Sequence, residues 1–118
     1  MSAVKQRSAD TWEMVNLVPE DTGLPMTVHA MPRGGARHDV RLKVHRSHGR
    51  RMGAGNTAEV GVRPVPHLVE NGLRPRDQIL VYQWVALNER ALVDYWEGRL
   101  STRKFLARLQ KLPSGAAP

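Results

Sequence analysis

The spacing of apolar residues changes once along this chain, at the turn signal Asn71-Gly72, and that change restricts the fold more than any other feature. Before the turn, apolar side chains recur at every second residue, most clearly in the segment 37–46. After it they recur every three or four residues from 76 to 97, with no Pro or Gly. A period of two is typical of a strand with one buried face, and a period near 3.6 is typical of an amphipathic helix. The sequence therefore predicts an α+β protein.

The first half predicts an antiparallel sheet of about four strands. Each predicted strand combines β-forming residues with a bounding turn, and the turn Pro19–Gly23 should join the first two as a hairpin. In the third strand the apolar Val40, Leu42 and Val44 should point to one face and Arg41, Lys43 and His45 to the other. The expected strands are Trp12–Val18, Met26–Met31, Arg37–Arg46 and Thr57–Arg63.

The second half predicts a C-terminal α-helical hairpin packed on one face of the sheet. One long amphipathic helix is expected from Arg76 to Glu97, and Gly98 suits the position after its end. Ser101 can cap a second helix, where Leu100 can pack on Phe105 as a hydrophobic staple. The short link makes the two helices antiparallel neighbours. The stripe of the long helix consists of Leu80, Trp84, Leu87, Ala91 and Tyr95, flanked by Val81, Leu92 and Trp96.

The length of 118 residues suits one hydrophobic core. We expect a single domain over residues 11–112, between a flexible N-terminus at 1–10 and a flexible tail at 113–118. The chain has no cysteine, which excludes disulfides and cysteine-based metal or nucleophile sites. Its start has no signal-peptide pattern, and no apolar run approaches the roughly 20 residues of a membrane span. We therefore expect a cytoplasmic protein with no membrane partner.

The positive charge is concentrated in two blocks. The formal net charge is +7, but residues 33–51 hold seven Lys or Arg against one Asp, and residues 99–118 hold five against none. Concentrated positive charge attracts phosphate more strongly than the same charge spread evenly. The predicted contact surface consists of Arg33, Arg37, Arg41, Lys43, His45, Arg46, His48, Arg50 and Arg51, and a secondary basic patch consists of Arg103, Lys104, Arg108 and Lys111.

These blocks predict a non-enzymatic binding module. A row of cations on a strand beside the Gly-rich and Arg-rich loop 47–56 can follow a phosphate backbone, so nucleic acid is the first expected partner. An acidic protein, bound by an inhibitor or antitoxin-type subunit, is the second possibility, and an ordinary solvated sheet face is the third. The oligomeric state is left open by the sequence.

Histidines supply the alternative of catalysis. His38, His45 and His48 lie close in sequence, but Asp39 is the one acid beside them, so we expect no metal site and no cofactor. A metal-independent ribonuclease could use His45 or His48 with Lys43 and an arginine. No catalytic residue is assigned. The polar Asn88, beside the apolar stripe, is expected to bond a neighbouring strand or loop.

The segment Trp84-x3-Asn88-x3-Leu92-x2-Tyr95-Trp96-x-Gly98-x2-Ser101-Thr102 resembles the C-terminal end of a set of small, uncharacterised bacterial proteins, some of which lie in toxin-antitoxin-like gene neighbourhoods. The resemblance covers the last third of the chain. It implies a prokaryotic α+β protein, and it carries over no catalytic residue.

Overall fold

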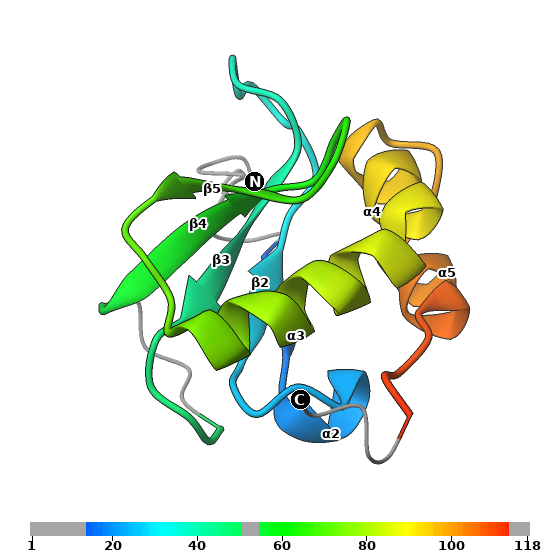
Figure 1. The fold of residues 1–118 in the computed structure, drawn as a ribbon. Coiled ribbons are helices and arrows are strands. Elements are labelled where there is room, and N and C mark those ends of the chain that lie inside the picture. Colours follow the sequence, from blue (N-terminus) through cyan, green and yellow to red (C-terminus); the bar gives the residue numbers. More distant parts are fainter. Residues whose placement is uncertain (1–13, 51–54, 114–118) are drawn as a thin grey trace.

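A computed structural model of the chain describes residues 14–50 and 55–113. Its five strands form one antiparallel sheet in which every strand pairs with its neighbour in sequence, in the order β1-β2-β3-β4-β5. Helices cover one face of this sheet (Figure 1), so the predicted α+β class is confirmed. The strands are β1 Val15–Leu17, β2 Val28–Ala30, β3 Arg41–His45, β4 Thr57–Gly61 and β5 His67–Glu70, and the helices are α2 Pro19–Thr22, α3 Pro75–Leu87, α4 Glu89–Trp96 and α5 Thr102–Arg108.

Strand β5 was not among the roughly four strands that the sequence predicted. It lies at the edge of the sheet, where Leu68 is half-buried and the other three residues are exposed. A strand with so little buried surface has no clear apolar alternation, and it directly follows Pro64 and Pro66, which read as a stop. The periodicity that identified β3 and β4 was therefore missing here.

The connection between β1 and β2 is a turn of helix. The expected hairpin pairing is confirmed, since Asn16 lies opposite His29 in antiparallel register. Within the connection, however, α2 replaces the simple turn predicted there. The Asp21 carboxylate accepts a hydrogen bond from the Val18 N–H at 3.0 Å, which satisfies a donor at the helix start. Gly23 ends the helix with a φ of 82°, a conformation that glycine adopts without strain.

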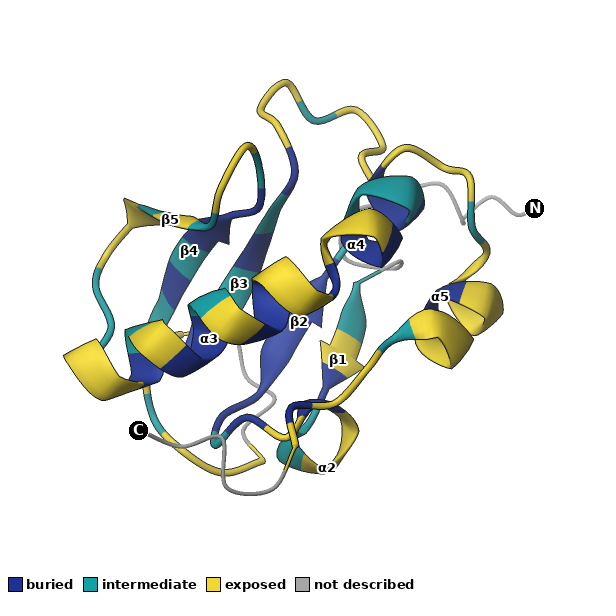
Figure 2. Ribbon diagram, turned by 45° about the vertical axis from the view of Figure 1, so that its right-hand side comes forward, coloured by how far each residue is buried: buried dark blue, intermediate teal, exposed yellow. Residues whose placement is uncertain are grey.

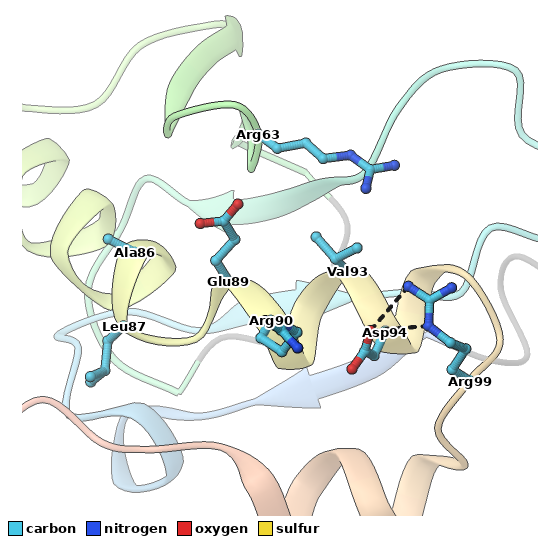
Figure 3. A pocket seen from close by; sticks show the side chains of 8 residues that line it. All are labelled: Arg63, Ala86, Leu87, Glu89, Arg90, Val93, Asp94 and Arg99. Atoms are coloured by element: carbon cyan, nitrogen blue, oxygen red, sulfur yellow. Dashed lines mark hydrogen bonds and ion pairs between the residues drawn. The ribbon is translucent and has the colours of Figure 1, made fainter.

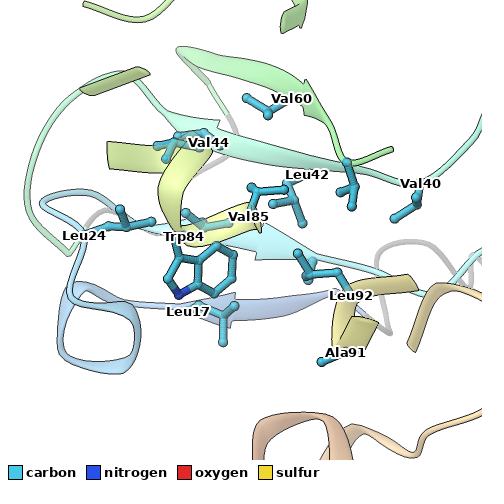
Figure 4. Packing of buried hydrophobic residues seen from close by; sticks show 14 of the residues in the cluster. Leu17, Leu24, Val40, Leu42, Val44, Val60, Trp84, Val85, Ala91 and Leu92 are labelled. Atoms are coloured by element: carbon cyan, nitrogen blue, oxygen red, sulfur yellow. The ribbon is translucent and has the colours of Figure 1, made fainter. Parts of the chain in front are cut away.

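The core lies between the sheet and α3. The apolar side chains of β3, Val40 just before it and Leu42 and Val44 within it, are buried beneath the helices as the alternation predicts. Val44 lies opposite Val28 on one side and Ala58 on the other, so all three strands turn the same face inward. Trp84 of α3 fills the middle of this layer and is 0% exposed (Figure 4). Figure 2 shows α3 with its buried side toward the sheet and its exposed side outward.

The expected long helix is interrupted at Asn88, which separates α3 from α4. The Asn88 Nδ2–H group donates to the Trp84 carbonyl and to the Gln110 carbonyl, both at 3.0 Å. Its Oδ1 accepts the Gln110 N–H at 2.7 Å. The expectation that this amide bonds a neighbouring loop is confirmed. The expectation of one uninterrupted helix was wrong. The expected burial of Leu87 was also wrong, because this side chain is 40% exposed.

The predicted hairpin is formed by α4 and α5. Ser101 caps α5 as expected, because its Oγ accepts the Lys104 N–H at 3.2 Å. Phe105 is buried and its ring stacks on Tyr95 of α4 with centroids 4.3 Å apart. Half-buried Leu100 also packs against the core, which supports the staple. The second helix is therefore held to the first by its cap and by an aromatic pair.

The segment after α5 returns to α2. Helix α5 ends at Arg108, and the buried Leu112 donates its backbone N–H to the Thr22 carbonyl at 2.9 Å. A Cβ on Gly23 would lie 2.7 Å from the Leu112 carbonyl oxygen, so the close approach also requires glycine at that position. The predicted flexible termini fall outside the described residues, apart from Pro113. None of the described helices has the length and apolar character needed to cross a membrane.

Asn88→Ala should destabilise the protein by about 2 kcal/mol, because the side chain is buried and makes three hydrogen bonds. Urea denaturation measures the free energy of unfolding. Gln83→Ala, an exposed change in α3, is the matched control and should alter that free energy by less than about 0.5 kcal/mol. Equal effects of the two changes would contradict the role given to the Asn88 amide.

Candidate nucleic-acid interface

Strand β3 directs its cations away from the helices, as the alternation predicts. Arg41 and Lys43 lie on the sheet face opposite Leu42 and Val44, and both are half-buried. Arg41 is ion-paired with Glu59 of β4 at 3.1 Å. Lys43 lies opposite both His29 and Glu59 in the sheet register. Arg41 and Lys43 therefore lie on the predicted face of the sheet, but an acid of the neighbouring strand, Glu59, lies beside them.

His45 does not belong to an exposed row, and that expectation was wrong. The residue is 3% exposed, and its Nε2 lies 2.9 Å from Nε2 of the equally buried His29. Nδ1 of His29 lies 2.7 Å from Oδ1 of Asn16, so this nitrogen donates. Nε2 of neutral His29 must then accept a hydrogen bond from His45. The two rings form a buried pair that a partner molecule cannot reach.

The far end of the predicted surface, after β3, is held by the protein's own groups. The Arg46 Nε–H donates to the Gly72 carbonyl at 2.9 Å. His48 lies 3.0 Å from both carboxylate oxygens of the buried Asp77, at the start of α3. Arg50 is ion-paired with Glu20 of α2 at 3.0 Å. Arg51 lies outside the described residues. These contacts hold residues 46–50, and the carboxylates of Glu20 and Asp77 offset positive charge at Arg50 and His48.

The opposite end of β3 retains unbalanced positive charge. Within the described residues, Arg33, Arg37 and Lys43 have no carboxylate partner, and the two arginines are exposed in the loop between β2 and β3. Arg33, Lys43 and the ion pair of Arg41 with Glu59 surround a hollow of about 270 Å³, and Arg37 lies outside its lining. We call it the cationic hollow. Its lining in the described chain consists of Met14, Met31, Pro32, Arg33, Ala36, His38, Arg41, Lys43, Glu59 and Trp96.

The cationic hollow has an aromatic wall that the sequence analysis did not assign to it. The rings of exposed His38 and buried Trp96 lie with centroids 5.4 Å apart and planes tilted by 31°. Trp96, at the end of α4, reaches this loop because its carbonyl accepts the Arg33 N–H at 2.8 Å. The basic block has no Trp, Tyr or Phe, and no sequence signal indicates that α4 supplies the missing aromatic group. The hollow thus combines cations with apolar and aromatic surface.

The secondary basic patch on α5 is also open to solvent. Arg103, Lys104 and Lys111 are exposed, whereas Arg108 lies 3.4 Å from Asp94 of α4. None of its residues lines the cationic hollow, and the patch lies on α5 and, at Lys111, on the segment after it. It can attract an anion by charge, but it offers no shape to select one.

A larger hollow, of about 710 Å³, lies on the helix side beside Arg63, Glu89, Arg90 and Asp94 (Figure 3). Two of its arginines, Arg63 and Arg99, belong to a chain of ion pairs with alternating sign, whereas Arg90 makes no ion pair with the described residues. Hydrogen bonds from Arg63, and then from Arg99, lower the pKa of Glu97 below its usual value of 4.5. Because this chain of ion pairs has three acids and three arginines, the chain itself has no net positive charge to attract an anion. The chain runs Asp39, Arg63, Glu97, Arg99, Asp94, Arg108.

Metal chemistry has no support in the described residues. They contain no group of three or more His, Asp or Glu side chains placed to hold an ion. His29 and His45 turn toward each other, and His48 faces one carboxylate, so the histidines are dispersed over two sites.

Comparisons with protein-family models, with curated proteins and with solved structures found no match to the chain. The resemblance of the C-terminal segment to small bacterial proteins therefore stays a prediction.

The buried histidine pair predicts a loss of stability in mild acid. Burial, and next the charges of His45 and Lys43, lower the pKa of His29 from 6.5 to about 4. The unfolded chain therefore binds more protons than the folded chain between these values, and the free energy of unfolding falls as the pH is lowered through this window. The loss of stability is negligible above pH 6.5 and amounts to about 2–3 kcal/mol by pH 4.

Urea denaturation across this pH range measures the effect. In His29→Gln, the difference from the wild-type free energy of unfolding should shrink as the pH falls, since the variant lacks the titrating ring. Exposed His67→Gln is the control and should keep the wild-type pH dependence. A His29→Gln variant with the wild-type slope would show that another group causes the acid sensitivity.

Proposed function

We propose that this protein is a non-enzymatic nucleic-acid-binding module whose contact surface is the cationic hollow and the exposed loop beside it. The observation that carries the proposal is the unbalanced charge at one end of β3. Arg33, Arg37 and Lys43 have no carboxylate partner in the described residues. By contrast, carboxylates pair Arg50 of the loop after β3, and they pair Arg63 and Arg99 beside the larger hollow. Phosphate contacts release counterions from nucleic acid and supply most of the sequence-independent affinity.

The rigid placement of these cations supports the same conclusion. Lys43 and Arg41 project from the middle of a five-stranded sheet, and the loop with Arg33 is fixed to the end of α4 by a backbone hydrogen bond of 2.8 Å. Cations that are already in position lose less conformational freedom when they meet a phosphate backbone than cations on a free tail. The surface is therefore suited to sequence-independent binding, sensitive to salt.

Charge reversal tests this proposal. Arg33→Glu/Arg37→Glu changes two exposed side chains and should weaken binding to a short oligonucleotide at least tenfold at low salt. The slope of log affinity against log salt concentration should become shallower by about 2. Fluorescence anisotropy with labelled RNA and DNA across a salt series measures both quantities.

Arg103→Glu/Lys104→Glu is the matched control, because it reverses two exposed charges on α5 and leaves the same net charge. If this control weakens binding as much as the loop variant, net charge and not the cationic hollow determines affinity. No binding of the wild-type protein to RNA or DNA at low salt would refute the proposal. A stoichiometric acidic protein that copurifies would then favour the interaction-subunit alternative.

The ribonuclease alternative depends on His48. Its side chain is 49% exposed and is oriented by a carboxylate that is 5% exposed, an arrangement that can hold an imidazole as a general base. His45, the other histidine considered for this role, is buried in the pair with His29. The contact between His48 and Asp77 also has a structural use, since it ties the loop after β3 to α3.

A cleavage assay separates the two uses of His48. If the protein is a ribonuclease, it should cleave RNA in EDTA, and His48→Ala should abolish cleavage while RNA binding persists. His67→Ala, at another exposed histidine, should leave cleavage unchanged. If the protein is a binding module, neither the wild type nor the two variants should cleave RNA. His48→Ala should then change only the stability of the protein.

A further inference from the structure

The cationic hollow has a composition that phosphate binding alone does not explain. Phosphate oxygens need cations and N–H donors, which Arg33, Arg41 and Lys43 supply. The rest of the lining includes Met31, Pro32 and Trp96, whose apolar surface does not favour a phosphate. A ligand that uses both parts carries negative charge next to a flat apolar group. A nucleotide unit has this combination, because its base has apolar faces and its phosphate lies one sugar away.

His38 is held in a position to stack on such a base. Its Nδ1 lies 2.8 Å from the Asp39 carbonyl oxygen, so Nδ1–H donates and the ring is fixed at one end. The Trp96 ring supports it, with centroids 5.4 Å apart. His38 itself is exposed. Base stacking on an exposed aromatic ring tolerates any sequence, because every base has a π face.

Glu59 gives the lining of the hollow a hydrogen-bond acceptor. Its carboxylate is 21% exposed and is held by Arg41 at 3.1 Å. Carboxylates accept hydrogen bonds from exocyclic amino groups of bases. An acid in a purely phosphate-binding surface would repel the ligand, but beside a base edge it supplies an acceptor that the surrounding cations cannot provide.

The size of the hollow restricts what can enter. A volume of about 270 Å³ lies just below the range of small-molecule sites and can take a group the size of one base. In a duplex the bases are stacked and paired, so a duplex can reach the rim cations and not the interior. A single strand can turn one base out of the stack at low cost.

We propose that the cationic hollow receives one unstacked base with its neighbouring phosphate, so that the protein selects single-stranded over double-stranded nucleic acid. This inference rests on the proposed function and adds a preference that charge alone would not produce. His38 serves as the stacking surface, Glu59 as the acceptor for a base edge, and Arg33 with Lys43 as the phosphate contacts.

Four oligonucleotides of equal length test the inference by fluorescence anisotropy at one low salt concentration: a single-stranded RNA, a single-stranded DNA, a DNA duplex, and a single-stranded DNA with abasic sites. We expect both intact single strands to bind about tenfold more tightly than the duplex or the abasic strand. RNA and DNA differ by the 2′-hydroxyl, so their comparison reports whether the sugar also contributes.

His38→Ala should weaken binding of the intact single strands about tenfold and leave duplex and abasic binding unchanged. His38→Phe should restore the single-strand preference, because it keeps an aromatic face. His67→Ala, at an exposed histidine of β5, is the control and should have no effect on any of the four ligands.

Two failures are distinguishable. If all four oligonucleotides bind with equal affinity and His38→Ala changes none of them, the base pocket is refuted while the proposed function stands. If none of the four binds, the proposed function and the inference fail together. A loss in His38→Ala that is equal for intact and abasic strands would also overturn the inference, because it would assign His38 to the backbone.

Discussion

The packing of β3 beneath α3 determines where every other part of this protein lies. Val40, Leu42 and Val44 are buried against the layer that contains Trp84. Because strand side chains alternate, their burial sends Arg41 and Lys43 to the opposite face. A slip of one residue would exchange the two sets, and it would bury cations in an apolar layer at a cost far above that of any surface contact. The position of the cationic face is thus a consequence of the core.

The protein's carboxylates decide which cations are available. The acids of α4 and of the loop before β3 join three arginines in a chain of alternating charges, and Glu20 and Asp77 hold the loop after β3. Surface ion pairs of this kind contribute little stability one by one, but they remove positive charge from the places where they form. Of the described cations that no carboxylate pairs, Arg33 and Arg37 lie in the loop between β2 and β3 and Lys43 lies beside it, while others, such as Arg103 and Lys104, lie on α5. The formal charge of the chain therefore overstates the positive charge of the regions where these ion pairs form.

The local part of this arrangement was predictable from the sequence. The inward face of β3, the Ser101 cap and the hydrogen-bonding role of Asn88 follow from periodicity, residue chemistry and spacing within a few residues. The burial of His45 was not predictable in this way, because it depends on His29 in another strand. The pairing of His48 with Asp77 joins residues 29 positions apart, and neither segment contains a pattern that indicates this contact.

The remaining differences have the same origin. The break at Asn88 arises because its amide bonds Gln110, which is 22 positions away. The aromatic wall of the cationic hollow depends on the end of α4 meeting the loop after β2, a contact between two segments whose patterns are independent. Strand β5 gained its partner without burying enough surface to leave a periodic pattern. Sequence periodicity therefore identified most of the strands and helices. The cationic hollow could not be predicted, because it forms where elements distant in sequence meet.

The simple strand order has a consequence for how the chain folds. Each strand pairs with the one that precedes it, so the sheet can grow by successive local pairings with short loop closures. The segment after α5 differs, because Gln110 and Leu112 bond to Asn88 and Thr22, which must already be in place. The sheet therefore depends on pairings between neighbours along the chain, whereas the C-terminal segment depends on contacts between residues far apart in sequence.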